Sequence, residues 1–176
     1  MAKPIPQPQE LQNARDGFVT SWGALGNAWG VNRTVAQIHA LLLVSSAPLT
    51  TDDVMAELRI SRGNANGSLR ELVNWGLVRS LVKKGERKEH FEAEKNIWKM
   101  FGIVIGERKR REVVPALQVL RRCEESLRGV KGAEAQSTLE FLKDLRQFME
   151  MGEKIMSRVE GTDKGVVMPL VLKFMR

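Results

Sequence analysis

The sequence of 176 residues is poor in the side chains that make disulfides and metal sites. It contains one cysteine, Cys123, and two histidines. A single cysteine excludes an intrachain disulfide and a zinc site built from paired cysteines, and two histidines are too few for a histidine-rich site. We therefore expect no metal and no cofactor. Cys123 is either a redox switch, which needs exposure and basic neighbours, or a structural thiol, which we favour because free cysteines are often buried.

Long apolar runs and enzyme motifs are also missing. No stretch has the length of apolar sequence that spans a bilayer, and the N-terminus lacks the apolar core of a secretory signal. We therefore expect a cytoplasmic protein without a membrane partner. The sequence has no phosphate-binding glycine loop, no nucleophile elbow and no cluster of metal ligands, so we expect no enzymatic activity.

Positive charge is in excess. Lysine and arginine total 28 against 21 acidic residues, which gives a net charge of +7. This balance favours polyanionic partners, either nucleic acid or an anionic membrane surface. We rank the membrane surface last, because the sequence has no basic amphipathic helix that is free to lie on a bilayer.

The organisation of the chain predicts a mainly α protein with a small β-hairpin wing. Residues 1–9 hold three of the six prolines and should form a flexible arm. Residues 10–30 should form the N-terminal helix of a dimerisation region, residues 31–95 a winged helix-turn-helix domain, and residues 96–176 a C-terminal helical dimerisation region.

The first two helices are indicated by apolar residues at helical spacing. Leu11, Phe18, Trp22 and Leu25 form one stripe between residues 10 and 27. A second helix should begin after an N-cap at Asn32 and end before Pro48, with a buried face made by Val35, Ile38, His39 and Leu42.

Two short helices and a hairpin follow. Residues 49–58 predict a helix capped by Thr50 or Thr51, with acidic residues in its first turn. Ser61 should cap the next helix, which ends at Gly76. Residues 77–82 and 88–92 are rich in β-formers around a basic turn, which is typical of a hairpin.

This order of elements points to double-stranded DNA. The second of the two short helices has a width that fits a major groove, where arginine pairs with guanine and asparagine with adenine. The residues expected on its DNA-facing side are Ser61, Arg62, Gly63, Asn64, Asn66, Gly67, Ser68 and Arg70. The residues expected to contact phosphate or the minor groove from the wing are Lys83, Lys84, Arg87 and Lys88.

The C-terminal half predicts further helices. Apolar residues from Ile97 to Ile105 indicate one helix, and Pro115 should kink it or start a new one. The charged run 107–112 is expected to be a solvated helix face. Ser137 to Glu140 has the capping-box pattern and predicts the start of the last helix, whereas the segment 166–174 is left unassigned.

A set of aromatic side chains gives a candidate effector pocket. Aromatic faces attract quaternary ammonium groups, so a small-molecule effector of that class is one interpretation. The alternative, which we favour, is that these side chains fill the core and a dimer interface. The set consists of Phe18, Trp22, Trp29, Trp98 and Phe101.

Several motifs in a fixed order resemble the MarR superfamily of winged-helix regulators, and more closely its GbsR-like branch. The resemblance covers roughly residues 22–98 and rests on residues 29–42, 61–66, 69–72, 75–78 and 85–94. It implies a homodimer with interleaved N- and C-terminal helices, acting as a repressor or other regulator on palindromic operators. It further implies a link to osmoprotectants such as glycine betaine. The alternative function is a winged-helix module for protein assembly or RNA binding.

Overall fold

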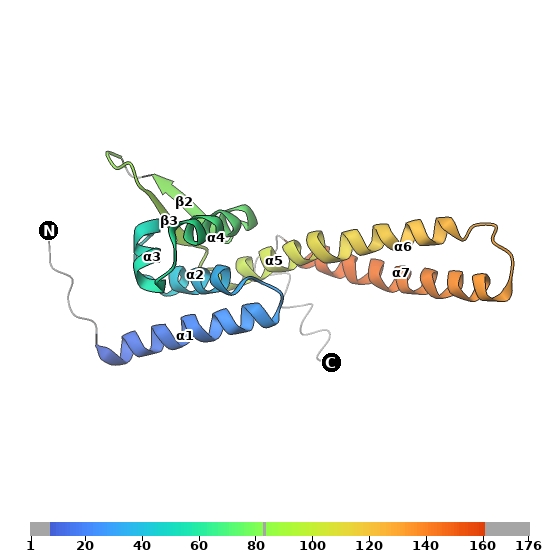
Figure 1. Cartoon of the computed structure of the whole chain (residues 1–176), viewed down its shortest axis with the longest axis horizontal. Coiled ribbons are helices and arrows are strands. Elements are labelled where there is room, and N and C mark those ends of the chain that lie inside the picture. Colours follow the sequence, from blue (N-terminus) through green and yellow to red (C-terminus); the bar gives the residue numbers. More distant parts are fainter. Residues whose placement is uncertain (1–7, 83, 161–176) are drawn as a thin grey trace. The chain divides into compact units, whose positions relative to one another are not determined.

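The computed structural model describes residues 8–82 and 84–160, which form two compact units that meet between Lys95 and Asn96. Figure 1 shows the helices and strands of each unit. Most of the predicted flexible arm, Lys83 and the segment 166–174 lie outside the described residues. Within the described part of the chain, no helix is long and apolar enough to cross a membrane.

The first unit is a helical domain with a small sheet. Its helices are α1 (Gln9–Ala28), α2 (Arg33–Val44), α3 (Thr51–Leu58) and α4 (Arg62–Trp75). Its strands are β1 (Leu49–Thr50), β2 (Val78–Val82) and β3 (Glu89–Ala93). The sheet is antiparallel in the order β1-β3-β2. We call the hairpin of residues 78–93 the wing.

The helix ends follow the local signals of the sequence. Asn32 caps α2 by accepting hydrogen bonds from the backbone of Thr34 and Val35. Thr50 and Asp53 form a capping box at the start of α3, and Ser61 accepts from the backbone N–H of Asn64 at the start of α4. These predicted caps are therefore confirmed, with Thr50 rather than Thr51 as the cap of α3.

One strand was not predicted. Residues 49–50 were expected to begin a helix, but they form β1, which pairs Leu49 with Phe91 and Thr50 with His90. The prediction was wrong because a strand of two residues is too short to show the alternation of polar and apolar residues that indicates a strand. Only the neighbouring β3, about 40 residues later in the chain, makes this segment a strand.

Helix α1 packs on α2 through small residues rather than through its aromatic stripe. Val19 and Gly23 are the buried residues of α1. A Cβ atom at Gly26 would lie only 2.5 Å from the Cβ of Ala36, so the glycine permits the close approach of the two helices. The predicted stripe remains on a different face, and its members Leu11 and Leu25 are exposed.

The core of the first unit lies between α2, α4 and the sheet. Ile38 and Leu42 of α2 and Leu69 and Leu72 of α4 are almost completely buried. The predicted buried face of α2 is confirmed, and it includes a polar side chain, His39. This core fixes the position of α4 relative to the wing, because β2 follows α4 after a single left-handed glycine, Gly76.

The second unit consists of helices. These are α5 (Ile97–Arg108), a π-helical turn (Lys109–Val113), α6 (Val114–Ser126) and α7 (Ala133–Val159). The π turn ends two residues before Pro115, which cannot donate a backbone hydrogen bond and is the second residue of α6. The helix therefore restarts at α6, as predicted. In the charged run, Arg110 pairs with Glu107 and Arg108 with Glu112, whereas Lys109 pairs with Glu160, directly after α7.

The predicted start of the last helix was wrong. Helix α7 begins at Ala133, four residues before the capping-box pattern at Ser137. Gly132 precedes it with a φ of 127°, a conformation that other residues rarely adopt. The helix therefore starts at the glycine turn, and the helix-forming residues from Ala133 onward place Ser137 inside its second turn.

Candidate DNA interface

Helices α3 and α4 form a helix-turn-helix. The turn between them contains Arg59 in the left-handed conformation, with a φ of 53°. Helix α4 packs on α2 and α3, and its buried residues Ala65, Leu69 and Leu72 lie on one side. The opposite side of α4 is therefore open to solvent along its first two turns.

The open side of α4 carries most of the predicted DNA-facing residues. Arginine and asparagine side chains there offer the donor and acceptor pairs that read guanine and adenine. The predicted residues that the structure leaves exposed are Ser61, Arg62, Gly63, Asn64, Asn66, Gly67 and Arg70.

Ser68 is a correction to this prediction. Its side chain is 6% exposed, on the core side of α4. Its hydroxyl donates to Oδ1 of Asn64 at 3.4 Å. Helical geometry places residue 68 one turn after residue 64, next to the buried Leu69 and Leu72. Ser68 therefore supports Asn64 and does not face a ligand.

The two asparagines of α4 are held by neighbouring elements. Asn64 donates to the hydroxyl of Thr34, at the start of α2, over 3.4 Å. Asn66 accepts a hydrogen bond from the hydroxyl of Thr51 over 3.2 Å. These contacts limit the rotamers of both amides before any partner binds, which lowers the entropy cost of recognition. Sequence reasoning missed Thr34 and Thr51 because they lie 30 and 15 residues from the amides they contact.

The glycines of α4 lie against open space. A Cβ atom at Gly63 or at Gly67 would meet no other atom of the described chain within 4 Å. Packing within the protein therefore does not require glycine at either position, although each glycine lowers helix stability by about 1 kcal/mol relative to alanine. A close approach of another molecule to the backbone of α4 is a physical reason for keeping them.

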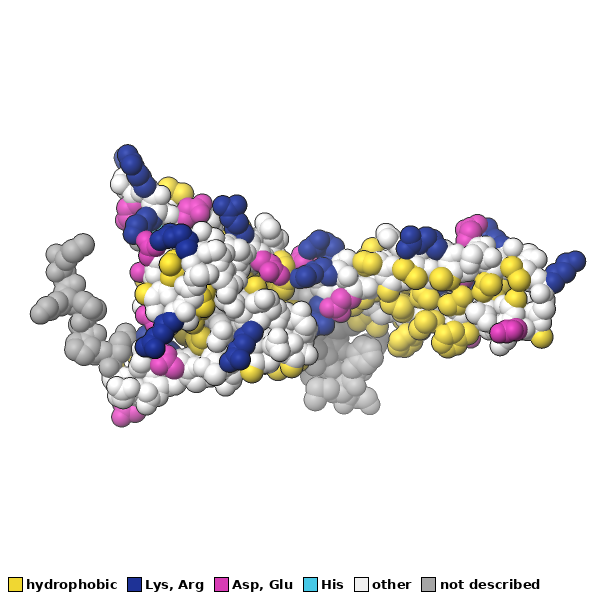
Figure 2. Space-filling view, in the orientation of Figure 1, with side chains coloured by type: hydrophobic (Ala, Val, Ile, Leu, Met, Phe, Trp, Pro, Cys, Tyr) yellow, Lys and Arg dark blue, Asp and Glu magenta, His cyan; other side chains and the backbone are white. Residues whose placement is uncertain are grey.

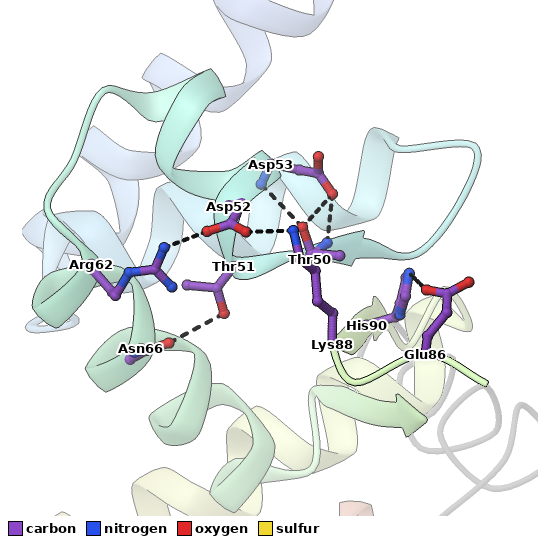
Figure 3. A network of polar contacts seen from close by, with 9 residues as sticks. All are labelled: Thr50, Thr51, Asp52, Asp53, Arg62, Asn66, Glu86, Lys88 and His90. Atoms are coloured by element: carbon purple, nitrogen blue, oxygen red, sulfur yellow. Dashed lines mark hydrogen bonds and ion pairs between the residues drawn. The ribbon is translucent and has the colours of Figure 1, made fainter. Parts of the chain in front are cut away.

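One carboxylate joins α4 to the wing (Figure 3). Asp52, in the first turn of α3, accepts a hydrogen bond from Nη2 of Arg62 at 2.5 Å through Oδ1. Its other oxygen, Oδ2, accepts from Nζ of Lys88 at 2.8 Å. Arg62 and Lys88 are both predicted DNA contacts, and both side chains are more than half exposed.

The bridge changes the ionisation of its members. The hydrogen bond from Lys88, and then that from Arg62, hold the pKa of Asp52 below its usual value. The same hydrogen bond raises the pKa of Lys88. Asp52 is therefore an anion, and Lys88 a cation, across the physiological pH range. The sequence analysis interpreted Asp52 only as a favourable acid in the first turn of α3. Asp53 completes the capping box without it, so the second acid was a sign that Asp52 has another partner.

The tip of the wing presents further cations. Lys84 and Arg87 are exposed around Gly85, whose φ of 87° makes the turn. Glu86 lies in the same turn, and one of its oxygens is 3.3 Å from Nε2 of the buried His90. Two exposed cations on a narrow hairpin suit a contact with phosphates rather than with bases.

The candidate effector residues are divided between the two units. Phe18 and Trp22 of α1 are half-buried, with ring centroids 5.4 Å apart, and Trp29 is exposed. In the second unit, Trp98 is half-buried and Phe101 is exposed. Cys123 of α6 is free and half-buried. A pocket formed by these aromatic side chains stays a prediction.

Residues 29–88 match the model of the MarR family. The match begins just before α2, contains the helix-turn-helix and β2, and ends next to β3. The chain resembles the MarR family through this segment. The predicted family and the predicted winged helix-turn-helix are thus confirmed, with a third strand added to the hairpin.

Two proteins that this chain resembles come from Bacillus subtilis (strain 168). The HTH-type transcriptional repressor GbsR is 25% identical over 108 residues, which are 61% of this chain and 59% of GbsR. The putative HTH-type transcriptional regulator YvaV is 21% identical over 91 residues, or 52% of this chain and 51% of YvaV. The similarity thus spans less than two thirds of either relative. Both are named as regulators rather than enzymes, in agreement with the prediction that this chain has no enzymatic activity.

A solved structure also resembles this chain. It is described as a transcriptional regulator and superposes with a TM-score of 0.64 at 20% sequence identity. The superposition covers 82% of this chain and 93% of the other. At this identity the comparison establishes the fold, and it extends the similarity beyond residues 29–88 into the remaining helices.

Proposed function

We propose that this chain is a transcriptional regulator that binds double-stranded DNA in a sequence-specific manner. The observation that carries the proposal is the open face of α4. Arg62, Asn64, Asn66 and Arg70 lie there together, on a helix held by a packed core and followed by a wing with exposed cations. The names of GbsR and YvaV support the same function, and GbsR is named a repressor.

The regulator acts as a homodimer on a palindromic operator. The support is the apolar surface that single chains leave uncovered, above all on α7, of whose 27 residues none is buried. Figure 2 shows hydrophobic side chains gathered along the α6–α7 hairpin. Surfaces of this kind mark interaction sites, and a symmetric dimer is the commonest way to cover them. A two-fold dimer presents two copies of α4, which requires two inverted half-sites.

Selection of bound duplexes from a random library at near-physiological salt tests this function. We expect an enriched palindrome whose half-sites lie about one helical turn apart. Weak binding that is sensitive to salt and enriches no sequence would contradict the proposal. It would direct attention to the alternative, a winged helix that serves RNA or protein partners, which binding to single-stranded and structured RNA would then examine.

Arg62→Ala should weaken binding to the selected operator by about 10- to 100-fold and relax the preference at one base position. The reason is that Arg62 is the first residue of α4 and lies on its exposed face. From there a guanidinium can reach the O6 and N7 atoms of guanine. Fluorescence anisotropy with the operator, with single-base variants of it and with unrelated duplexes measures both effects.

Lys84→Ala is the matched control, because it removes a cation from the wing tip instead of from α4. It should lower affinity for all duplexes alike and reduce the slope of log affinity against log salt by about 0.9 for one lost phosphate contact. If Arg62→Ala also reduced affinity equally on every sequence, Arg62 would be a phosphate contact and not a base contact.

Gly67→Ala should stabilise the protein by about 0.5–1 kcal/mol and still weaken operator binding. Stability should rise because alanine favours the helix and its Cβ meets no atom of the chain. Binding should weaken because the same Cβ fills space that we assign to the DNA. Thermal unfolding and anisotropy measure the two effects, and Asn74→Ala, at an exposed position in the last turn of α4, is the control. A stabilised variant with unchanged affinity would show that DNA does not approach α4 at this glycine.

An effector response completes the proposal. The neighbouring rings of Phe18 and Trp22, tilted by 35°, offer aromatic faces of the kind that bind quaternary ammonium groups. An effector acts only if it binds the DNA-competent and DNA-incompetent dimers with different affinity. Repeating the operator titration with glycine betaine and with choline therefore tests this part, and unchanged operator affinity with both would contradict it.

A further inference from the structure

We infer that Asp52 is a specificity-determining residue, which occupies the DNA-contacting cations Arg62 and Lys88 in the free protein and releases them only to a matching operator. This inference rests on the proposed function. Asp52 itself is not a base-reading group here, since both of its oxygens are already engaged.

The geometry of the bridge is that of a phosphate contact made within the protein. One oxygen accepts from a guanidinium and the other from an ammonium, at 2.5 and 2.8 Å. A DNA phosphate likewise accepts hydrogen bonds from guanidinium and ammonium groups at such distances. One cation comes from α4, and the other comes from the turn of the wing, just before β3. A single anion thus lies between the two elements expected to contact DNA (Figure 3).

Local folding does not require an acid at this position. The capping box of α3 is completed by Thr50 and Asp53, whose carboxylate accepts from the backbone N–H of Thr50 at 2.8 Å. Asp52 makes no cap hydrogen bond among the contacts of the described chain, and its carboxylate points instead to Arg62 and Lys88. The remaining local contribution of Asp52 is a first-turn charge, which Glu at the same position would also supply.

An anion at this junction affects matching and non-matching DNA differently. On unrelated DNA both cations contact phosphates, which must compete with Asp52 and then lie close to its negative charge. Like charges brought together in an interface oppose binding. On the operator Arg62 contacts an uncharged guanine edge instead, so the cost is smaller there than on unrelated DNA. In the free protein the bridge also fixes the wing relative to α4. This favours the arrangement of wing and α4 that binds the operator.

The test compares Asp52→Asn with the wild type in the full chain, on the selected operator and on an unrelated duplex of equal length. We expect Asp52→Asn to bind the unrelated duplex about 3- to 10-fold more tightly, as two exposed ion pairs are released. The slope of log affinity against log salt on that duplex should become steeper by about one to two units, because each phosphate contact adds about 0.9. The ratio of operator to unrelated affinity should fall by about the same factor or more.

Two further variants keep the test sharp. Asp52→Glu retains the negative charge and should keep the affinity ratio of the wild type. Glu57→Gln removes a negative charge from the same helix, at an exposed position outside the bridge, and should leave the ratio unchanged. Unfolding midpoints of all variants, which we expect to stay close to the wild type, separate loss of fold from loss of discrimination.

The outcomes distinguish this inference from the function on which it rests. A wild type that selects no operator overturns the proposed function itself. A wild type that selects an operator, with an unchanged affinity ratio and salt slope in Asp52→Asn, overturns the role of Asp52 alone. An equal change in Glu57→Gln would also overturn it, because the effect would then belong to net charge and not to the bridge.

Discussion

Phe148→Glu is expected to separate the proposed homodimer into monomers and to weaken operator binding by about 10²–10⁴-fold. In one chain, Phe148 is 67% exposed and Phe141 is 66% exposed, and Ile155 is also exposed. These three residues follow one another at intervals of seven. Because two helical turns hold about 7.2 residues, they form a single line along α7.

The size of the effect follows from the chemistry of the surface. A buried phenylalanine contributes about 1.5–3 kcal/mol relative to an exposed one, and a glutamate in its place must be desolvated without a partner. The dimer dissociation constant should therefore rise by at least about a hundredfold. Operator affinity then falls because a monomer engages one half-site and loses the gain from linking two.

Sedimentation velocity over a range of protein concentrations measures the first effect, and anisotropy with the operator measures the second. Lys143→Glu is the control, because it places a carboxylate on α7 about 140° around the helix from Phe148. Helix content and the unfolding midpoint of each variant report on the fold. A Phe148→Glu variant that remains dimeric at micromolar concentration would show that α7 is not the dimer interface.

Lowering the pH from about 6.5 to 4 is expected to cost the protein about 3 kcal/mol of its free energy of unfolding through one residue, His39. The side chain is 5% exposed in α2, and its Nε2 has no hydrogen-bond partner in the described chain. Burial disfavours the charged imidazolium and lowers the pKa of His39 from 6.5 to about 4.

The direction of the effect follows from proton binding. Above pH 6.5 the histidine is neutral in both the folded and the unfolded chain, so it adds no dependence on pH. Between pH 6.5 and 4 the unfolded chain takes up a proton that the folded chain does not, and the free energy of unfolding falls as the pH falls. Below pH 4 the folded histidine is protonated as well, and the loss reaches its limit.

Denaturant unfolding at a fixed protomer concentration between pH 4 and 8 measures this dependence, since dimerisation itself contributes to stability. His39→Leu has a similar volume without a titratable group and should flatten the curve in this window. The depressed pKa values of Asp52 and Glu150 concern a lower range, because carboxylates titrate below about pH 4.5. An equally steep curve in His39→Leu would assign the dependence to other groups.

Features that depend on a few neighbouring residues, such as helix caps, were predicted well from the sequence. Asn32, Thr50 and Ser61 cap the helices that follow them, and Gly76 ends α4 in the left-handed conformation. A cap acts on backbone groups within three or four residues, so its sequence pattern contains all its partners. The predicted helix start at Ser137 was wrong for a reason that is also local. The glycine turn at Gly132 is a stronger signal for the start of α7 than the capping-box pattern.

The candidate site was predicted in its residue types but not in its contacts. The exposed face of α4 follows from helical period, which was right for Arg62, Asn64 and Asn66 and wrong for Ser68. Ser68 lies at the edge of the buried side, where the period alone does not decide exposure. Packing of α4 against α2 and α3 decides it.

The sequence by itself determined that this chain contains a winged helix with a basic wing, because period, caps and turn residues act over short distances. Only the tertiary structure decided that β1 joins the sheet, that Thr34 and Thr51 hold the asparagines of α4, and that Asp52 bridges Arg62 to Lys88. Lys88 lies 36 residues after Asp52 in the chain. The physical reason is that such contacts depend on how separate elements pack, and no local pattern encodes which two of them will meet.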